Sequence, residues 1–126
     1  MGHLVDSNVL IDYVAERFNP QQLHKLDTIF DIELNVSVIT KIEILGFNAP
    51  REEEKKMLKF FSTANMIALT DNIIELTIDL RKKVKLKTPD AIIAATALVY
   101  NYTLLSRNLT DFKNIPVLTV IDPHTF

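Results

Sequence analysis

The feature that most constrains the fold of this chain is a regular alternation of short apolar segments with longer amphipathic segments. The short segments are rich in β-branched or other apolar residues, and we predict strands at residues 4–5, 34–39, 103–105 and 117–120. Residues 66–69 are either a further short strand or an apolar connection. Between them, apolar residues recur at the spacing of helices that bury one face. Alternating strands and helices favour a parallel sheet, because the crossover between parallel strands is long enough to hold a helix.

This pattern predicts an α/β protein in which a mainly parallel central sheet lies between two layers of helices. The chain has 126 residues, a length that supports a hydrophobic core, and no internal repeat or Pro/Gly-rich linker divides it. We therefore expect a single domain over residues 1–126. Residue types that cap or open helices place the predicted helix starts at Ser7 or Asn8, Pro20, Thr40, Pro50, Asp71 and Thr88.

The composition excludes several classes of enzyme. Gly2 and Gly46 are the only glycines, so the chain has no glycine-rich phosphate-binding loop, no dinucleotide fingerprint and no nucleophile elbow. Without cysteine it has no thiolate metal site or disulfide, which suits a reducing cytoplasm. We find no secretory signal and no run of the roughly 20 apolar residues that span a membrane. We expect a cytoplasmic protein without membrane contacts.

Four carboxylates are predicted to gather at one edge of the sheet. Asp6 follows the first predicted strand, Glu43 lies shortly after the second, Asp90 is in the first turn of a long helix, and Asp111 lies past the strand at residues 103–105. Parallel sheets build their sites at the carboxyl ends of the strands. Clustered carboxylates repel one another and need protons or a cation to persist, and hard oxygen ligands select Mg²⁺ or Mn²⁺. This pattern indicates metal-assisted hydrolysis of a phosphodiester.

Four segments that contain these acids resemble the successive signatures of PIN-domain proteins, specifically the VapC toxins of bacterial toxin–antitoxin modules. They are residues 4–11 (LVDSNVLI), 39–45 (ITKIEIL), 87–97 (KTPDAIIAATA) and 104–112 (LLSRNLTDF). The resemblance covers nearly the whole chain in order. It implies a PIN-like fold and an endoribonuclease that uses Mg²⁺ or Mn²⁺ to cleave structured RNA such as tRNA or rRNA. It also implies a cognate VapB-type antitoxin and a homodimer.

The resemblance also implies roles for individual residues. It makes Asp6, Glu43 and Asp90 metal ligands. The fourth ligand is either Asp111 or Asn108, and we favour Asp111 because a carboxylate binds a divalent ion better than an amide does. We propose that metal-bound water attacks the phosphorus in line. Whether one or two ions bind stays open.

Further candidates are two hydroxyls and a group of basic residues. Ser7 and Ser106 either support the acids or serve only as a helix cap and a strand-end hydroxyl. The net charge of −2 does not by itself favour RNA, but a basic run at residues 81–87 ends just before Asp90. These cations either stabilise a helix C-terminus or contact phosphates. The candidate phosphate contacts are Arg81, Lys82, Lys83, Lys85 and Arg107.

Alternative functions make different demands on the sequence. A receiver domain needs an acidic pair after the first strand, and a haloacid-dehalogenase-like phosphatase needs a second Asp where this chain has Asn8. The alternative that stays open is a catalytically weak PIN domain that binds RNA or a protein. We expect no histidine metal site, because the three histidines are far apart in the sequence. Asp12 is expected to lie on a solvated helix face.

Overall fold

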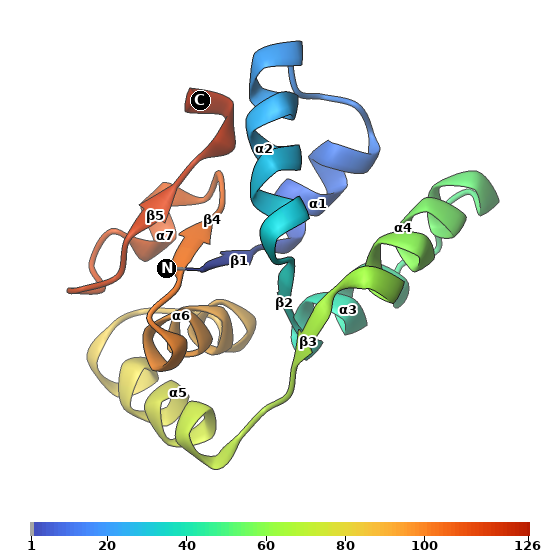
Figure 1. Cartoon of the computed structure of the whole chain (residues 1–126). Helices are drawn as coiled ribbons and strands as arrows, with labels where there is room; N and C mark the ends of the chain where they lie inside the picture. The colour runs from blue at the N-terminus through green and yellow to red at the C-terminus, as the bar shows by residue number, and fades with distance from the viewer. Residues whose placement is uncertain (1) are drawn as a thin grey trace.

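The fold is a five-stranded sheet with helices on both faces, and a computed structural model describes residues 2–126 of it (Figure 1). The strand order is β3-β2-β1-β4-β5, and every pairing among the described residues is parallel. The α/β class predicted from the alternation is therefore confirmed, with a sheet that is fully parallel. The strands are β1 (His3–Val5), β2 (Asn35–Ser37), β3 (Asn65–Ile67), β4 (Thr103–Leu105) and β5 (Val120–Ile121).

The helices form two layers, as the predicted three-layer sandwich requires. In Figure 1, α5 and α6 lie together on one side of the sheet, while α1, α2 and α4 lie on the other. The helices are α1 (Ser7–Val14), α2 (Pro20–Ile32), α3 (Val38–Leu45), α4 (Arg51–Thr63), α5 (Asp71–Lys83), α6 (Thr88–Tyr100) and α7 (Leu109–Phe112), and a 3₁₀ helix, η1, spans Pro123–Thr125. No helix of the described part of the chain is long and apolar enough to cross a membrane.

Two hydrophobic cores form because successive strand residues point to opposite faces of the sheet. On β1, Leu4 packs with the core under α5 and α6, whereas Val5 packs with the core under α1, α2 and α4. Leu104 and Leu105 of β4 divide in the same way. All four side chains are at most 1% exposed. The short central strands are thus fixed from both sides, and so is the edge where they end.

The second predicted strand was too long. Residues 34–39 are rich in β-branched residues, but β2 ends at Ser37, and Val38 already begins α3. The Ser37 side chain accepts a hydrogen bond from the backbone N–H of Ile39 at 3.2 Å, so Ser37 caps this helix and Thr40 does not. Thr40 lies inside α3, where its buried hydroxyl has no hydrogen-bond partner among residues 2–126. Local capping outweighs strand propensity at this position.

Other boundaries also differ from the prediction. Asp6 caps α1 in place of Ser7 or Asn8, and Thr70 caps α5 in place of Asp71. The last strand begins only at Val120, because Val117 adopts a left-handed conformation with φ of 72° and lies in solvent. The short helix α7 was not predicted. The helix starts at Pro20, Pro50 and Thr88 are confirmed to within one residue.

Candidate active site

The candidate site lies where the strand order reverses direction. From β1 the sheet grows through β2 to β3 on one side and through β4 to β5 on the other. Ligands of open parallel sheets bind at such a switch point, beyond the carboxyl ends of the strands. Asp6 follows β1 and Ser106 follows β4, and the Asp6 backbone N–H donates to the Leu105 carbonyl at 3.0 Å. The topology therefore brings these two side chains together across the chain.

Asp6 is held by three hydrogen-bond donors. The Ser106 hydroxyl donates to Oδ2 of Asp6 at 2.8 Å, and the Ser7 backbone N–H donates to Oδ1 at 2.8 Å. The Asn8 side-chain amide donates to Oδ2 at 3.3 Å and also reaches the Ser106 hydroxyl at 3.2 Å. Asp6 is only 6% exposed. Its carboxylate is thus fixed in orientation before any ligand binds.

The other predicted acids share the electrostatic surroundings of Asp6. Burial raises the pKa of Asp6, and the charge of Glu43 adds to the increase, while hydrogen bonds from Ser106, Ser7 and Asn8 oppose it. Burial likewise raises the pKa of Asp90, followed by the charges of Asp6 and Asp111. The fold therefore brings the four predicted acids, which come from distant parts of the sequence, close enough to repel one another.

The remaining predicted side chains connect to this group by hydrogen bonds. The Ser7 hydroxyl donates to Oε1 of Glu43 at 3.2 Å, so Ser7 links the start of α1 to α3. The Asn108 side-chain amide donates to Oδ2 of Asp111 at 2.8 Å. The Asn108 backbone N–H also donates to the Ser106 hydroxyl at 3.0 Å. Asn108 and Asp111 therefore lie beside each other, and the amide orients the carboxylate.

The donor set fits a hard divalent cation. It consists of four carboxylates and the hydroxyl or amide groups that orient them, which is the chemistry that Mg²⁺ and Mn²⁺ prefer. No three acidic or histidine side chains of residues 2–126 are already drawn together closely enough to hold an ion. Clustered carboxylates repel one another, and a bound cation would neutralise them.

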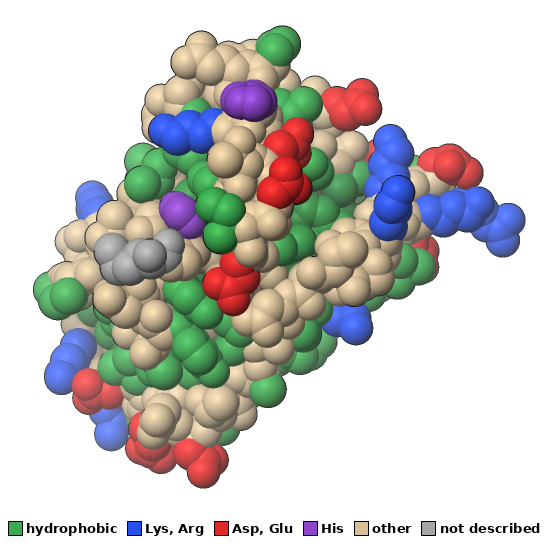
Figure 2. Space-filling view, in the orientation of Figure 1, with side chains coloured by type: hydrophobic (Ala, Val, Ile, Leu, Met, Phe, Trp, Pro, Cys, Tyr) green, Lys and Arg blue, Asp and Glu red, His purple; other side chains and the backbone are tan. Residues whose placement is uncertain are grey.

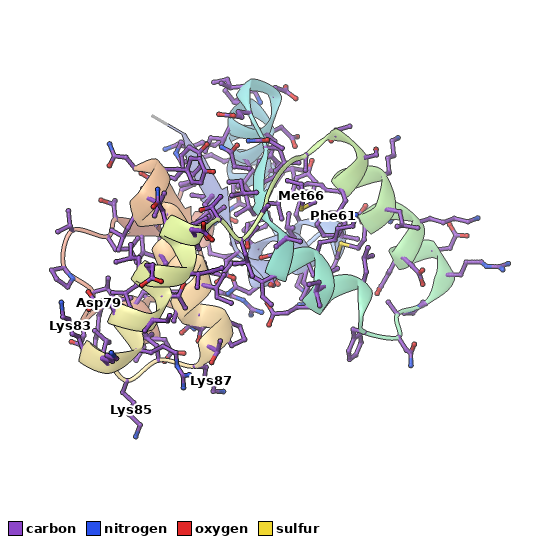
Figure 3. All side chains as sticks on the ribbon, turned by 90° about the horizontal axis from the view of Figure 1, so that it is seen from below. Phe61, Met66, Asp79, Lys83, Lys85 and Lys87 are labelled. Atoms are coloured by element: carbon purple, nitrogen blue, oxygen red, sulfur yellow. The ribbon has the colours of Figure 1, made fainter. Side chains whose placement is uncertain are left out.

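The basic run lies at the end of α5 and in the loop that leads to α6. Figure 3 shows Lys83, Lys85 and Lys87 along this stretch, where they point away from the body of the protein. Lys83 forms an exposed ion pair with Asp79 at 3.0 Å, one helical turn earlier. The charge of Lys87 lowers the pKa of Asp90 against the larger effects of burial and the acidic neighbours. The end of this run therefore reaches the acidic site electrostatically. Arg81 and Lys82, like Lys83 and Lys85, are exposed.

Asp12 is the clearest correction to the sequence analysis. It was expected on a solvated face, but it is 1% exposed. Its oxygens contact Nη1 of Arg17 at 3.1 Å, Nε of Arg107 at 3.3 Å and Nε2 of His124 at 2.9 Å. Burial acts to raise the pKa of Asp12, but these partners outweigh it and hold the pKa below its usual value. The partners lie far from Asp12 in sequence or beyond its helix, so helical spacing gave no signal of them.

Asn8 was also missed as a site residue, because in the sequence it suits a simple helix cap. It donates to Asp6 and Ser106, and its Oδ1 accepts the backbone N–H of Arg107 at 3.1 Å. One side chain thus joins the start of α1 to the loop after β4. The signal available in the sequence was its position two residues after the strand-end carboxylate.

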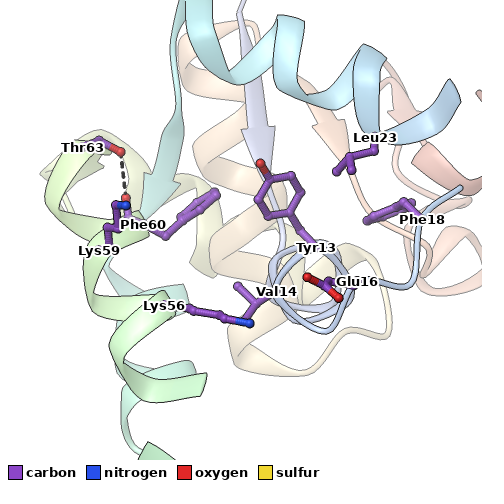
Figure 4. A pocket seen from close by; sticks show the side chains of 9 residues that line it. All are labelled: Tyr13, Val14, Glu16, Phe18, Leu23, Lys56, Lys59, Phe60 and Thr63. Carbon is purple, nitrogen blue, oxygen red and sulfur yellow. Dashed lines mark hydrogen bonds between the residues drawn. The ribbon is translucent and has the colours of Figure 1, made fainter. Parts of the chain in front are cut away.

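Two depressions flank α1. A groove of about 480 Å³ adjoins the acids, and we call it the α1–α4 groove; its lining includes Ser7, Ile11, Arg17, Glu43, Phe47 and Met57. A second hollow, of about 550 Å³, contains none of the predicted site residues and is lined by Tyr13, Phe18, Leu23, Lys56, Lys59 and Phe60, among others (Figure 4). Tyr13 and Phe60 meet edge to face in this hollow. On the face shown in Figure 2, basic side chains gather over α4 and acidic ones follow α2.

Comparison with known proteins agrees with this fold. Residues 3–118 match the family described as PIN domain. A curated protein named Ribonuclease VapC, from Rickettsia bellii (strain RML369-C), is 25% identical over 138 residues and 96% of each chain. A chain in a toxin-antitoxin complex from Klebsiella pneumoniae is 31% identical, with a TM-score of 0.77 over 97% of this chain and 98% of that chain. A chain of DNA-bound VapBC from Salmonella typhimurium is 18% identical, with a TM-score of 0.83 over 98% of each chain. The chain belongs to the PIN domain family, and its predicted resemblance to VapC-type members is confirmed.

Proposed function

We propose that this protein is an endoribonuclease that depends on Mg²⁺ or Mn²⁺ and acts as the toxin of a VapBC-type module. The observation that carries the proposal is the convergence of four acids at the switch point of a PIN-domain sheet, with Asp6 fixed by Ser106, Ser7 and Asn8. The resemblance to a protein named Ribonuclease VapC supports the reaction class. Structured RNA such as tRNA or rRNA is the proposed substrate.

Asp6, Glu43, Asp90 and Asp111 are the residues proposed to hold the cation. When bound, a divalent ion lowers the pKa of water and neutralises charge at the phosphate. The side chains around these acids orient them for that task. Ser106 and Asn8 fix Asp6, Ser7 reaches Glu43, and Asn108 reaches Asp111. In this proposal Asn108 is a positioning residue and Asp111 the fourth ligand.

Cleavage by purified protein tests the proposal. We expect the wild type to cleave cellular RNA when Mg²⁺ or Mn²⁺ is added, and Asp6→Asn and Asp90→Asn to lose at least a hundred-fold in rate. Glu75→Gln, an exposed acid on α5, is the matched control and should retain full activity. Mapping 5′ ends of RNA after brief induction of the wild type and Asp6→Asn would identify the substrate.

The same experiment decides between the enzyme and the open alternative. A catalytically weak PIN domain that only binds RNA or a protein would give no new 5′ ends and no metal-dependent cleavage. Retention of wild-type cleavage by both Asp6→Asn and Asp90→Asn would instead show that the acids are not the active site. For the fourth ligand, Asp111→Asn should lose more activity than Asn108→Ala, since only the carboxylate is proposed to bind the ion.

The basic run is proposed to contact RNA phosphates. Arg81, Lys82, Lys83 and Lys85 are exposed, and Lys87 already influences Asp90. Each phosphate contact on a single strand contributes about 0.7 to the slope of log affinity against log salt. Neutralising Lys82, Lys83 and Lys85 together should therefore flatten the salt dependence of RNA binding. An unchanged slope would leave these residues the role of solvated helix-end cations.

A VapB-type antitoxin is the proposed protein partner, and the α1–α4 groove is its proposed docking site. The solved neighbours include toxin-antitoxin complexes. Phe47, in the groove lining, is 74% exposed and offers an apolar contact beside Ser7 and Glu43. We expect Phe47→Ser to weaken co-purification with a tagged VapB-type antitoxin. Val117→Ser, which changes an even more exposed apolar residue elsewhere, should not.

A homodimer is also proposed. Exposed isoleucines on α3 and α5 provide apolar surface that a second copy would cover: Ile42 is 61% exposed, Ile74 40% and Ile78 46%. Light scattering on the purified protein should give twice the chain mass. Replacing Ile42 and Ile78 with Glu should give the monomer mass if these helices form the interface.

A further inference from the structure

Asp12 has more cationic partners than one buried carboxylate needs. A single guanidinium would neutralise its charge, yet Arg17, Arg107 and His124 all contact it. The two guanidinium groups alone leave one net positive charge on this cluster. The Arg17 and Arg107 side chains are 57% and 48% exposed, so this excess charge faces solvent.

Arg107 is held at two points by α1. Its backbone N–H donates to Oδ1 of Asn8 at 3.1 Å, and its Nε lies 3.3 Å from Oδ2 of Asp12. Asn8 and Asp12 are four residues apart, so they share one face of the helix. Within residues 2–126, no acceptor pairs with the two Nη groups of Arg107. The guanidinium is thus anchored through one edge, and its other donors remain available.

Both arginines adjoin the acidic site. Arg107 directly follows Ser106, which donates to Asp6, and the Asn8 side chain bonds to Asp6, to Ser106 and to the Arg107 backbone. Arg17 lines the α1–α4 groove, which also contains Ser7 and Glu43. The two arginines are therefore connected to the proposed active site, Arg107 through Ser106 and Asn8 and Arg17 through the α1–α4 groove.

We propose that Arg17 and Arg107 form a subsite for a backbone phosphate of the RNA that flanks the cleaved one, and that Asp12 is the positioning residue of this subsite. The proposal rests on the proposed ribonuclease function. A guanidinium with unpaired Nη groups matches the geometry of a phosphate, to which it donates two parallel hydrogen bonds. A subsite of this kind would fix the position of the scissile phosphate relative to the acids.

Binding without metal tests the subsite separately from catalysis. The probe is a fluorescein-labelled single-stranded oligoribonucleotide of mixed sequence, followed by anisotropy in EDTA between about 50 and 200 mM salt. We expect Arg107→Ala to weaken binding about ten-fold and to lower the salt slope by about 0.7. Arg107→Lys keeps the positive charge but loses the two parallel donors of the guanidinium, so its RNA affinity should lie between those of the wild type and Arg107→Ala. Arg51→Ala, an exposed arginine on α4, is the control and should match the wild type.

Asp12→Asn separates two explanations, because they predict opposite changes in RNA affinity. The substitution removes a negative charge, so a merely electrostatic patch would bind RNA more tightly. If Asp12 positions the arginines, binding becomes weaker although the net charge has become more positive. Thermal melting of the variant, with Arg17→Ala measured in parallel, shows whether the protein is folded at the assay temperature. If Asp12→Asn does not fold, the Arg107 series decides alone.

The possible results separate three conclusions. If Arg107→Ala binds RNA with the affinity and the salt slope of the wild type, the proposed subsite is wrong, whatever the cleavage assay gives. If RNA binding is unchanged while binding of a poly-glutamate peptide is lost, the arginines serve an acidic protein partner and the RNA subsite is also overturned. Loss of RNA binding in Arg107→Ala together with full cleavage by Asp6→Asn would retain the subsite and reject the proposed active site.

Discussion

Removing one acid from the proposed metal site should make the metal-free protein more stable. Burial and the charges of Asp6 and Asp111 raise the pKa of Asp90, so the folded state disfavours its charged form at neutral pH. Because Asp90 is partly exposed and its neighbours are screened by water, we expect Asp90→Asn to gain about 1 kcal/mol in the free energy of unfolding. For a chain of this length, that raises the melting temperature by about 4 °C.

Bound metal should reverse the order of the two melting temperatures. A ligand that binds only the folded state at a hundred-fold excess over its dissociation constant stabilises it by about 2.7 kcal/mol. Mn²⁺ should therefore raise the melting temperature of the wild type by roughly 10 °C. Asp90→Asn, which lacks one proposed ligand, should gain little from Mn²⁺. The variant then melts above the wild type in EDTA and below it in Mn²⁺.

Differential scanning calorimetry of the wild type, Asp90→Asn and Glu75→Gln, each in EDTA and in Mn²⁺, measures this crossing. Glu75→Gln should follow the wild type in both buffers. The pH dependence follows from the raised pKa of Asp90. The charged carboxylate destabilises the folded state, and protonation removes this effect. The higher stability of Asp90→Asn in EDTA should therefore vanish as pH falls to about 4. The reasoning is refuted if Asp90→Asn melts at or below the temperature of the wild type in EDTA. It is also refuted if Mn²⁺ raises the melting temperature of Asp90→Asn as much as that of the wild type.

Three further predictions concern single residues. Ser106→Ala removes a donor to Asp6 and should lower Mn²⁺ affinity at least ten-fold in isothermal titration, while a folded variant with unchanged affinity would exclude this orienting role. Phe112→Ala leaves a cavity in a core where the ring is 1% exposed and should cost about 3–4 kcal/mol in urea unfolding. Asp12→Asn should lose about 2 kcal/mol at pH 7. Because the folded pKa of Asp12 is lowered, that difference should shrink as pH falls below about 4.

The fold was predictable because its strongest signals are local in sequence. Alternating apolar runs and amphipathic segments identify the element types, and a parallel sheet follows from their order. The errors arose where two local preferences compete. Residues 38 and 39 are β-branched and favour a strand, but Ser37 caps a helix and the backbone turns there. Sequence patterns could not rank the two, because the outcome depends on how α3 packs between β2 and its neighbours.

The candidate site divides in the same way. The four acids were predictable because each lies near a strand end or a helix start, and the switch point brings such positions together. The environment of Asp12 was not, since its partners Arg107 and His124 are brought to α1 only by the pairing of β4 with β1 and by the chain beyond β5. In the sequence, a single carboxylate among the apolar residues of α1 suggests the solvated face of an amphipathic helix. Only tertiary structure shows that it is buried among cations.

The four acids and the two arginines on Asp12 form two charge clusters. Together they narrow the range of possible ligands more than either cluster does alone. The acids repel one another and are proposed to hold a cation, while the arginines on Asp12 carry excess positive charge and are proposed to bind a phosphate. Helix α1 contributes to both clusters, with Asp6 at its cap, Asn8 in its first turn and Asp12 one turn later. A ligand that satisfies both must present a divalent cation and an anionic group side by side. A polyphosphodiester with bound divalent cations has both groups along its whole length. A free metal ion lacks the anionic group, and an isolated carboxylate lacks the cation. Under the proposed function, the net charge of −2 understates the attraction for RNA, because the clustered acids would be neutralised by the metal while the arginines face the phosphates.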